Sequence, residues 1–251
     1  MIQYSLENSI GTIILDQNEK NSFSKADFLT LQSILVEIQK NTPNLLVLKS
    51  GTPDIFSAGL NLADLGGSQT EESIKEFLDL FFGNLEKIYT LPCPTIAAVS
   101  GHALGYGAML ALVCDIRFGM NNIRFGLPEV KIGIRVPSFV YAILGETIGN
   151  QRATEHTIFG DAEKAKDIAS VFYSLSETKE EFDKALKSTI SKLSKNSSQA
   201  MVETKKAILL TKKPLLDLIA LDKDLTRKSL NSSHAKEGIA AAQGGRRPNF
   251  V

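Results

Sequence analysis

The chain has no excess of charge of either sign: 28 lysines and arginines balance 28 aspartates and glutamates, and the formal net charge is +0. Without a global positive field, the composition does not favour binding to nucleic acid or to an acidic membrane surface. No apolar run approaches the length of a membrane span, and the first residues show no secretory pattern. We therefore expect a cytoplasmic protein, or an organelle protein without its targeting peptide, that binds neither nucleic acid nor membrane.

Cysteine and histidine are both scarce. Cys93 and Cys114 lie in separate apolar runs and form no C-x-x-C pair, so we expect buried thiols in a reducing compartment and no disulfide. His102, His156 and His234 are scattered, without an H-E-x-x-H motif. The sequence therefore predicts no metal site, and we expect His102 to be a packing or surface residue.

Loops typical of nucleotide binding and of serine nucleophiles are missing too. The glycines from Gly101 to Gly107 follow neither G-x-G-x-x-G nor the phosphate-loop pattern with G-K-[S/T]. Ser100 lacks the leading glycine of a nucleophile elbow. These absences disfavour a dinucleotide-binding fold, a P-loop enzyme and an α/β-hydrolase.

The segment 94–133 carries the main positive signal. Residues 95–99 form a short apolar run that predicts a buried strand, and from Ala108 the run MLALVC predicts a buried helix. Free N–H groups at the start of such a helix attract negative charge. The intervening glycines either shape a functional turn or simply allow tight strand-to-helix packing.

Other segments predict an α/β fold. Residues 10–15 and 45–48 are expected strands, and between them Ser24 and Asp27 form a capping box before a helix that Pro43 stops. The length allows one large α/β domain or a core with an appendage.

Helices are expected in the rest of the chain. An apolar stripe over 71–91 predicts a long helix that packs in the core and, in part, lines a pocket. The preceding residues 66–69 are either a mobile lid or a plain surface loop. Further helices are expected over 175–194, 201–210 and 215–230.

Three ordered motifs then resemble one family. Residues 99–117 resemble the G-x-A-x-G-G-G-x-x-L-A-x-x-C-D-x-R signature of the enoyl-CoA hydratase/isomerase (crotonase) superfamily. Residues 56–62 are similar to its F-x-A-G-x-D-L, and residues 125–133 resemble its F-x-x-P-E-x-x-x-G. A weaker likeness continues through 237–239 and 247–250.

The resemblance implies an architecture and a partner. The expected fold is a crotonase-like α/β fold of repeated ββα units, with an acyl-CoA-binding core over 1–195 and a C-terminal helical region over 196–251. In the family such helices make a trimerisation domain, so a homotrimer, or a hexamer built from two trimers, is implied. The expected partner is an acyl-CoA thioester, and no separate cofactor is implied because coenzyme A belongs to the substrate.

The resemblance also implies an oxyanion hole. Removing a proton next to a thioester carbonyl leaves an enolate whose charge lies mostly on oxygen, and two backbone N–H groups can stabilise it. By resemblance these donors belong to Ala58 and Tyr106. Tyr106 stands where the family usually has glycine, but a main-chain donor survives that change, and its side chain is expected to shape the acyl pocket.

The position matching the first of the family's two hydratase glutamates is Met109, whose thioether cannot take a proton. The second matches Glu129. One carboxylate can move a proton between two carbons, so the resemblance favours a Δ3,Δ2-enoyl-CoA isomerase. The alternatives are a hydratase, decarboxylase or thioester hydrolase using another acid, or a non-catalytic acyl-CoA-binding homologue.

Several further residues receive roles by resemblance. Asp64 is expected to cap a helix and not to serve as an auxiliary acid. Asp115 and Arg117 are expected to serve structure. The predicted substrate-binding residues are Phe56, Ser57, Gly59, Leu60, Asn61, Leu62, Gly105, Met109 and Pro128. The candidate cations for the coenzyme A phosphates are Lys20, Lys25, Arg246 and Arg247.

Overall fold

The structure is a computed structural model that describes residues 1–65 and 70–250. The proposed lid at 66–69 lies outside the described residues. The strands are β1 (Gln3–Glu7), β2 (Ile10–Leu15), β3 (Leu45–Ser50), β4 (Ile55–Ser57), β5 (Thr95–Val99), β6 (His102–Leu104), β7 (Ile116–Met120), β8 (Arg124–Gly126), β9 (Glu163–Lys164) and β10 (Ser174–Ser176).

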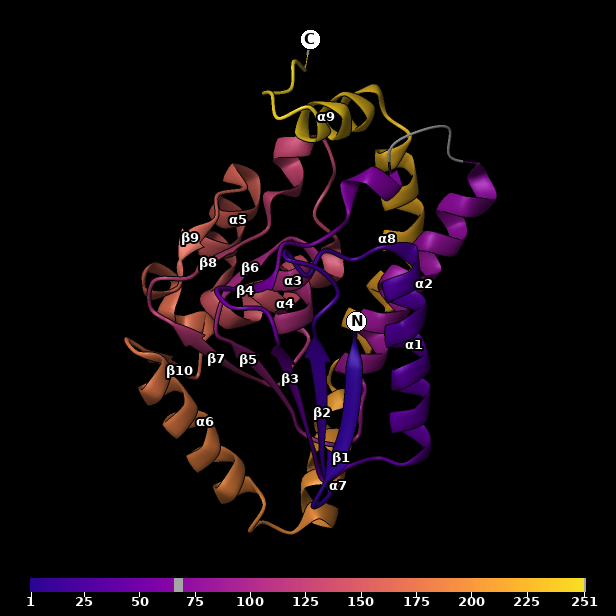
Figure 1. Cartoon of the computed structure of the whole chain (residues 1–251). Coiled ribbons are helices and arrows are strands. Elements are labelled where there is room, and N and C mark those ends of the chain that lie inside the picture. The colour runs from indigo at the N-terminus through magenta and orange to yellow at the C-terminus, as the bar shows by residue number, and fades with distance from the viewer. Residues whose placement is uncertain (66–69, 251) are drawn as a thin grey trace.

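The helices fall into a core set and a C-terminal set (Figure 1). The core set is α1 (Lys25–Lys40), α2 (Glu71–Tyr89), α3 (Tyr106–Leu112), α4 (Ser138–Ile148), α5 (Asn150–Phe159) and α6 (Lys179–Leu193). The C-terminal set is α7 (Ser198–Leu210), α8 (Lys213–Leu230) and α9 (Ser233–Gln243). Short 3₁₀ helices span Leu62–Leu65, Pro128–Ile132 and Ala165–Val171.

Two sheets organise the core. The larger has six strands in the order β1-β2-β3-β5-β7-β10, all parallel except the antiparallel pair β1 and β2. The smaller has the order β4-β6-β8-β9. Since β4, β6 and β8 follow β3, β5 and β7 in the chain, the second sheet gathers the segments that leave the carboxyl ends of the first.

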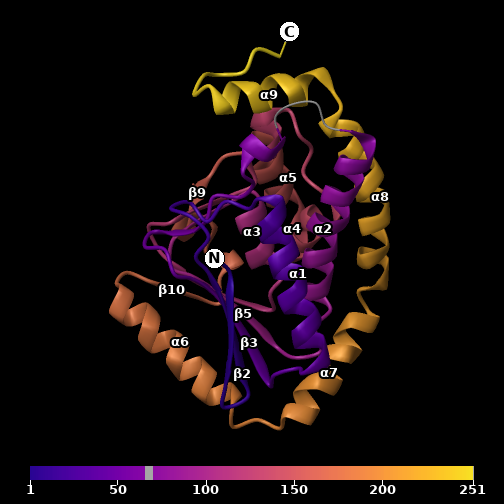
Figure 2. The same ribbon diagram turned by 45° about the vertical axis from the view of Figure 1, so that its right-hand side comes forward.

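Helices cover both faces of the larger sheet, which is the arrangement that parallel strands require. Residues on one face, including Val47, Ile96 and Phe118, pack against Phe182 and Leu186 of α6. The opposite face of the sheet packs in the main core, which α1, α2, α3 and α4 cover (Figure 2). This arrangement confirms the predicted α/β fold.

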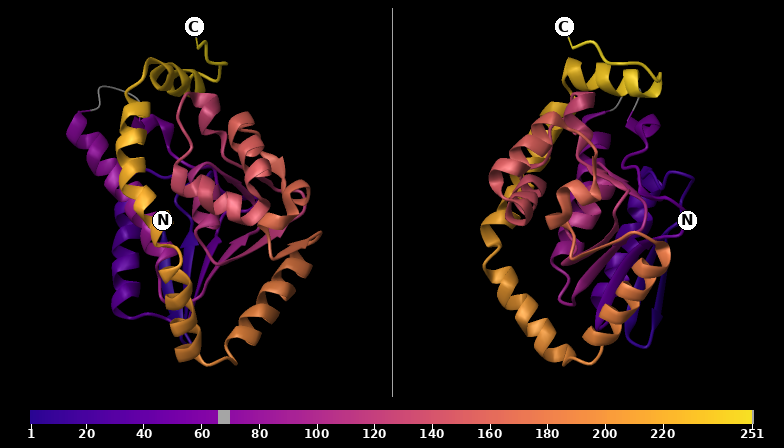
Figure 3. Two further views of the ribbon diagram at one scale, coloured as in Figure 1. Left: turned by 180° about the vertical axis from the view of Figure 1, so that it is seen from behind. Right: turned by 90° about the vertical axis from the view of Figure 1, so that its left-hand side faces the viewer.

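The C-terminal helices fold back onto the core. From α6 the chain turns into α7 and α8, and α8 runs along the outside of α2 and α4 (Figure 3). Asp222 of α8 is fully buried and accepts hydrogen bonds from the N–H groups of Ser138 and Phe139 at 2.8 Å. It therefore caps the N-terminus of α4, while Arg135 pairs with it at 2.6 Å.

Four predicted helix starts were off by two to four residues, and the helices placed from Met201 and Leu215 begin at Ser198 and Lys213. The helix placed from Ala108 begins at Tyr106, because Gly105 at φ +52 ends the preceding strand and forms the N-cap. The helix placed from Leu175 begins at Lys179, where Thr178 and Glu181 form a capping box. Leu175 itself lies in β10, an edge strand that pairs with β7.

Candidate active site

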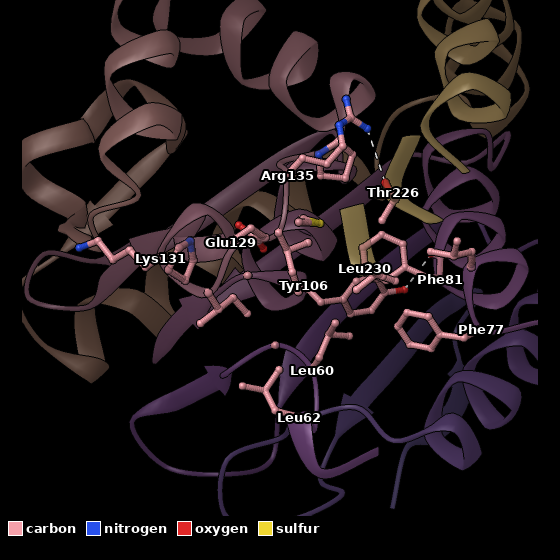
Figure 4. Close-up of a pocket in the computed structure, with 18 of the residues that line it drawn as sticks. Leu60, Leu62, Phe77, Phe81, Tyr106, Glu129, Lys131, Arg135, Thr226 and Leu230 are labelled. Carbon is pink, nitrogen blue, oxygen red and sulfur yellow. Dashed lines mark hydrogen bonds between the residues drawn. The ribbon is translucent and has the colours of Figure 1, made fainter. Parts of the chain in front are cut away.

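One apolar cavity lies where the segments after β4, β6 and β8 meet α2 and α8, and its empty volume, including the part open to solvent, is about 870 Å³. Figure 4 shows Glu129, Tyr106 and Leu60 near its centre, with Phe77 and Phe81 of α2 at one end. Its lining is Ala58, Gly59, Leu60, Leu62, Phe77, Leu78, Phe81, Gly105, Tyr106, Met109, Pro128, Glu129, Lys131, Ile132, Ile134, Arg135, Pro137, Thr226 and Leu230.

The loop after β4 corrects the expected donor. The Ala58 N–H donates to the carbonyl of Lys20 at 2.9 Å, so it is not available to a substrate. The Gly59 N–H donates to Ser57 Oγ at 3.2 Å, and the Asn61 N–H donates to the Phe23 carbonyl at 2.9 Å. Among the described residues the Leu60 N–H has no acceptor, so it replaces Ala58 as the free donor of this loop.

The N–H of the second expected donor, Tyr106, lies at the start of a helix. Tyr106 is the first residue of α3, and no side chain in ranges 1–65 and 70–250 caps this helix start. Its N–H has no acceptor in the part of the chain that the structure describes, as expected for a first helical turn. A Cβ on Gly59, whose φ is +96, would lie 3.3 Å from the Tyr106 nitrogen, so the two loops meet closely here. Two free N–H groups therefore belong to residues that line one cavity.

Glu129 is the second residue of the 3₁₀ helix Pro128–Ile132. Its Oε2 is shielded from solvent and has no hydrogen-bond partner among the described residues. Burial raises the pKa of Glu129 to about 7, and a hydrogen bond from a backbone N–H lowers that pKa by a smaller amount. A Cβ on Gly105 would lie 3.1 Å from its Oε1, so a side chain there would crowd the carboxylate. An acid poised in this range can take and return a proton at neutral pH.

The two cations among the described lining residues, Lys131 and Arg135, both form ion pairs. Lys131 pairs with Asp161 and points away from Glu129 in Figure 4. Arg135 is held by Asp222 and by Ser138 Oγ at 2.7 Å. Met109 is buried in the lining, and Glu129 is the only carboxylate among the lining residues described.

The Tyr106 side chain lies deep between α1 and α2. Its ring packs against Phe28 and Phe81 with centroid distances of 4.8 and 4.7 Å, and its hydroxyl lies 3.4 Å from the Phe81 carbonyl oxygen. Burial raises the pKa of this phenol well above its usual value, so it is a neutral wall of the cavity.

Most of the predicted substrate-binding residues line the cavity, but three do not. Phe56 is fully buried in the main core, because strand alternation turns it inward. Ser57 is also buried, and its hydroxyl donates to the Asn21 carbonyl at 2.7 Å. Asn61 accepts from the Ala63 N–H at 3.2 Å and so caps the 3₁₀ helix Leu62–Leu65. Asp64, the expected cap, lies inside that helix.

Sequence reasoning missed the lining residues after Glu129 and those on α8. Ile132, Ile134, Pro137, Thr226 and Leu230 complete the cavity. Helical spacing predicted α8 itself, but not that it returns to the site. The aromatic stripe of 71–91 did point to Phe77 and Phe81.

The C-D-I-R segment serves the fold. Asp115 accepts from the Thr95 N–H at 2.7 Å and from the buried Lys205 at 2.7 Å. Arg117 donates to the carbonyls of Leu112, Cys114 and Val171. Neither residue lines the cavity described above.

The cysteines are buried, and two of the three histidines form hydrogen bonds within the protein. Cys93 and Cys114 are free and buried, as predicted. His102 Nδ1 accepts from the Arg124 N–H at 2.8 Å, and the buried His156 contacts Glu163 at 2.6 Å. No group of His, Cys, Asp or Glu suited to a metal ion occurs in the described ranges 1–65 and 70–250.

Two of the candidate cations for the coenzyme A phosphates form ion pairs with glutamates on the surface. Lys25 pairs with Glu76 at 2.6 Å, and Arg246 pairs with Glu237 at 2.5 Å. The Lys20 carbonyl accepts from the Ala58 N–H, so Lys20 lies beside the loop after β4. The assignments to coenzyme A phosphates stay predictions. In the described part of the chain, no helix is long and apolar enough to span a membrane.

Comparisons with known proteins find one matching family. The profile of the family described as enoyl-CoA hydratase/isomerase matches residues 5–251. A methylglutaconyl-CoA hydratase from Rattus norvegicus is 28% identical over 99% of this chain and 82% of its own length. An enoyl-CoA isomerase/hydratase from Mycosarcoma maydis is 34% identical over 63% of this chain and 62% of its own length.

Solved structures show the same fold. An enoyl-CoA hydratase from Bacillus halodurans superposes with a TM-score of 0.87 over 96% of this chain and 99% of that chain, at 22% identity. The family profile spans nearly the whole sequence, including every loop of the cavity. The chain therefore belongs to the enoyl-CoA hydratase/isomerase family and has the crotonase fold.

Proposed function

We propose that the protein is a Δ3,Δ2-enoyl-CoA isomerase in which Glu129 is the only acid–base group. The N–H groups of Leu60 and Tyr106 bind the thioester carbonyl oxygen. The apolar lining between α2 and α8 holds the acyl tail. Coenzyme A is part of the substrate, and no separate cofactor takes part.

The reaction moves one proton and one double bond. The Glu129 carboxylate removes a proton from C2 of a 3-enoyl-CoA, and the electron pair of the broken C–H bond passes into the thioester carbonyl as an enolate. The two N–H groups stabilise the oxygen that gains this charge. The enolate then re-forms the carbonyl, C2 and C3 become the double bond, and Glu129 returns the proton to C4.

The observation that carries the proposal is the lone carboxylate. Hydration, as the family performs it, uses two glutamates on one water, and here Met109 occupies one of those positions. Isomerisation needs only one group that accepts and returns a proton, and a pKa of about 7 suits both halves of that task.

Hydration is the second candidate, because the relative from Rattus norvegicus is named a hydratase and the one from Mycosarcoma maydis an isomerase/hydratase. In that reaction water would add across the double bond of a 2-enoyl-CoA, with Glu129 working together with an acid other than residue 109.

Product analysis separates the two candidates. Purified protein is incubated with a 3-enoyl-CoA and, separately, with the matching 2-enoyl-CoA, and products are separated by liquid chromatography. We expect 2-enoyl-CoA from the first and little 3-hydroxyacyl-CoA from the second. Efficient hydration of the 2-enoyl-CoA without conversion of the 3-enoyl-CoA would contradict the proposal and favour the hydratase, and hydration that persists in Glu129→Gln would show that neither reaction depends on Glu129. Tight binding without conversion of either ester would favour a non-catalytic acyl-CoA-binding protein.

A further inference from the structure

Residues 20–23, just before α1, run beside the loop that carries the free Leu60 donor. The Lys20 carbonyl accepts from the Ala58 N–H, and the Phe23 N–H donates to the Gly59 carbonyl, both at 2.9 Å. The Phe23 carbonyl accepts from the Asn61 N–H at 2.9 Å. Backbone bonds to residues 20–23 thus fix the peptide groups on both sides of Leu60.

Asn21 occupies the centre of this contact. Its carbonyl accepts from Ser57 Oγ at 2.7 Å, and that same Oγ accepts from the Gly59 N–H at 3.2 Å. Its side-chain Nδ2 donates to the Phe56 carbonyl at 3.3 Å. One residue therefore holds β4 through both its backbone and its side chain.

The side chain of Asn21 is in turn fixed to the larger sheet. Nδ2 also donates to the carbonyl of Leu15, the last residue of β2, at 3.1 Å, and to Ser50 Oγ, at the end of β3, at 2.9 Å. Oδ1 accepts from Thr52 Oγ1 at 3.2 Å and from the Gln17 N–H at 3.1 Å. Asn21 is 0% exposed and has a φ of +44, a backbone conformation that asparagine tolerates better than most residues.

These bonds satisfy the N–H groups of Ala58, Gly59 and Asn61 and leave that of Leu60 free. An oxyanion donor stabilises a transition state only when it is held in place beforehand, and an error of about 1 Å can cost about 100-fold in rate.

We propose that Asn21 is a positioning residue for the oxyanion hole, anchoring the loop after β4 to the ends of β2 and β3 so that the Leu60 N–H faces the substrate. Asn21 does not line the cavity and touches no reacting atom. This inference rests on the proposed function, because it presumes that an enolate forms in the site.

The test compares two coenzyme A esters that are not isomerised. One is a saturated acyl-CoA, and the other is a 3-oxoacyl-CoA of equal chain length, whose enolate places negative charge on the thioester oxygen. The affinity ratio between them, measured by titration calorimetry and by the ultraviolet absorbance of the enolate, reports on the oxyanion hole and not on general folding.

Asn21→Gly is the principal variant, because glycine keeps the positive φ and loses only the side-chain bonds. We expect the preference for the enolate ester to fall about tenfold or more and kcat to fall with little change in KM. Ser57→Ala, which loses the bonds to Asn21 and Gly59, is the milder second variant if Asn21→Gly does not fold, and the same direction is expected.

Asn84→Ala is the matched control. Asn84 is equally buried and donates to the Phe28 carbonyl at 2.9 Å, but it lies on α2 outside this contact. We expect it to lower the stability and leave the enolate preference unchanged. An unchanged preference in folded Asn21→Gly or Ser57→Ala would overturn the inference. A wild-type protein without any enolate preference would instead count against the proposed function.

Discussion

At the residue scale, the proposed isomerisation depends on the ionisation of Glu129. Its carboxylate must be charged to remove a proton from C2, and burial raises its pKa to about 7. We therefore expect kcat/KM for isomerisation to rise with pH through about 7 and then to level off. Initial rates measured across a pH series check this, and a profile that is flat down to about pH 5 would show that another group is the base.

In the proposed function, Met109 is the residue that distinguishes this site from that of a two-acid hydratase. We expect Met109→Glu to add a second carboxylate to the cavity, to raise hydration of 2-enoyl-CoA above the wild-type level, and to slow isomerisation because two adjacent acids disfavour each other's ionisation. Met109→Gln is the control of similar size without the charge. Equal hydration rates in Met109→Glu and Met109→Gln would show that a carboxylate at position 109 does not promote hydration.

The motif after β4 shows where sequence reasoning stops. It located the loop of the proposed oxyanion hole but assigned the donor to Ala58, two residues from the free N–H of Leu60. Which N–H groups are free depends on residues 20–23, whose bonds to this loop connect positions about 40 residues apart along the chain. The motif itself contains no sign of that partner.

At the element scale, local signals predicted the parts of the fold that carry them. The capping box of α1, the apolar run of β5 and the stripe of α2 all correspond to observed elements. The three-residue strands β6 and β8 were not predicted, because a strand that short has no periodicity to detect.

Lys205 connects α7 to the core and gives a test of how the C-terminal helices are held. Its ammonium is buried and donates to the Cys93 carbonyl at 2.9 Å as well as to Asp115. We expect Lys205→Met to lower the free energy of unfolding by about 2 kcal/mol, as measured by urea titration.

Lys206→Met is the matched control, because Lys206 is exposed and, among the described residues, forms an ion pair only with Glu203 on the same helix. We expect it to change the stability by less than about 0.5 kcal/mol. Equal effects at the two positions would mean that the buried contacts of Lys205 contribute little to stability.

At the scale of the whole molecule, Glu129 links the active site to the stability of the protein. Its pKa is about 7 in the folded protein, against an ordinary value of 4.5 for a glutamate, so the folded state binds more protons between these values. Its contribution to stability is therefore fully present below about pH 4.5 and is lost as the pH rises through about 7.

Glu129→Gln removes this titration. We expect the difference in free energy of unfolding, variant minus wild type, to be about 2 to 3 kcal/mol larger at about pH 8 than at about pH 5. Urea unfolding of both proteins at these two pH values measures this change. If the two proteins differed in free energy of unfolding by the same amount at both pH values, burial of the carboxylate would not hinder its ionisation.

The assembly and the location of the molecule stay predictions. The family fold is established, but the homotrimer or hexamer, the division at residue 195 and the cytoplasmic location come from resemblance and composition alone. Sedimentation measurements on the purified chain would decide between a monomer, a trimer and a hexamer.

The most direct test of the central claim follows a hydrogen label through one turnover. A 3-enoyl-CoA carrying deuterium at C2 is converted in ordinary water, and the product is analysed by mass spectrometry and NMR. Because Glu129 Oε2 is shielded from solvent, we expect a measurable share of the 2-enoyl-CoA to carry deuterium at C4. A product whose C4 hydrogen comes entirely from water, from the first turnover onward, would contradict a single glutamate as the carrier of the proton.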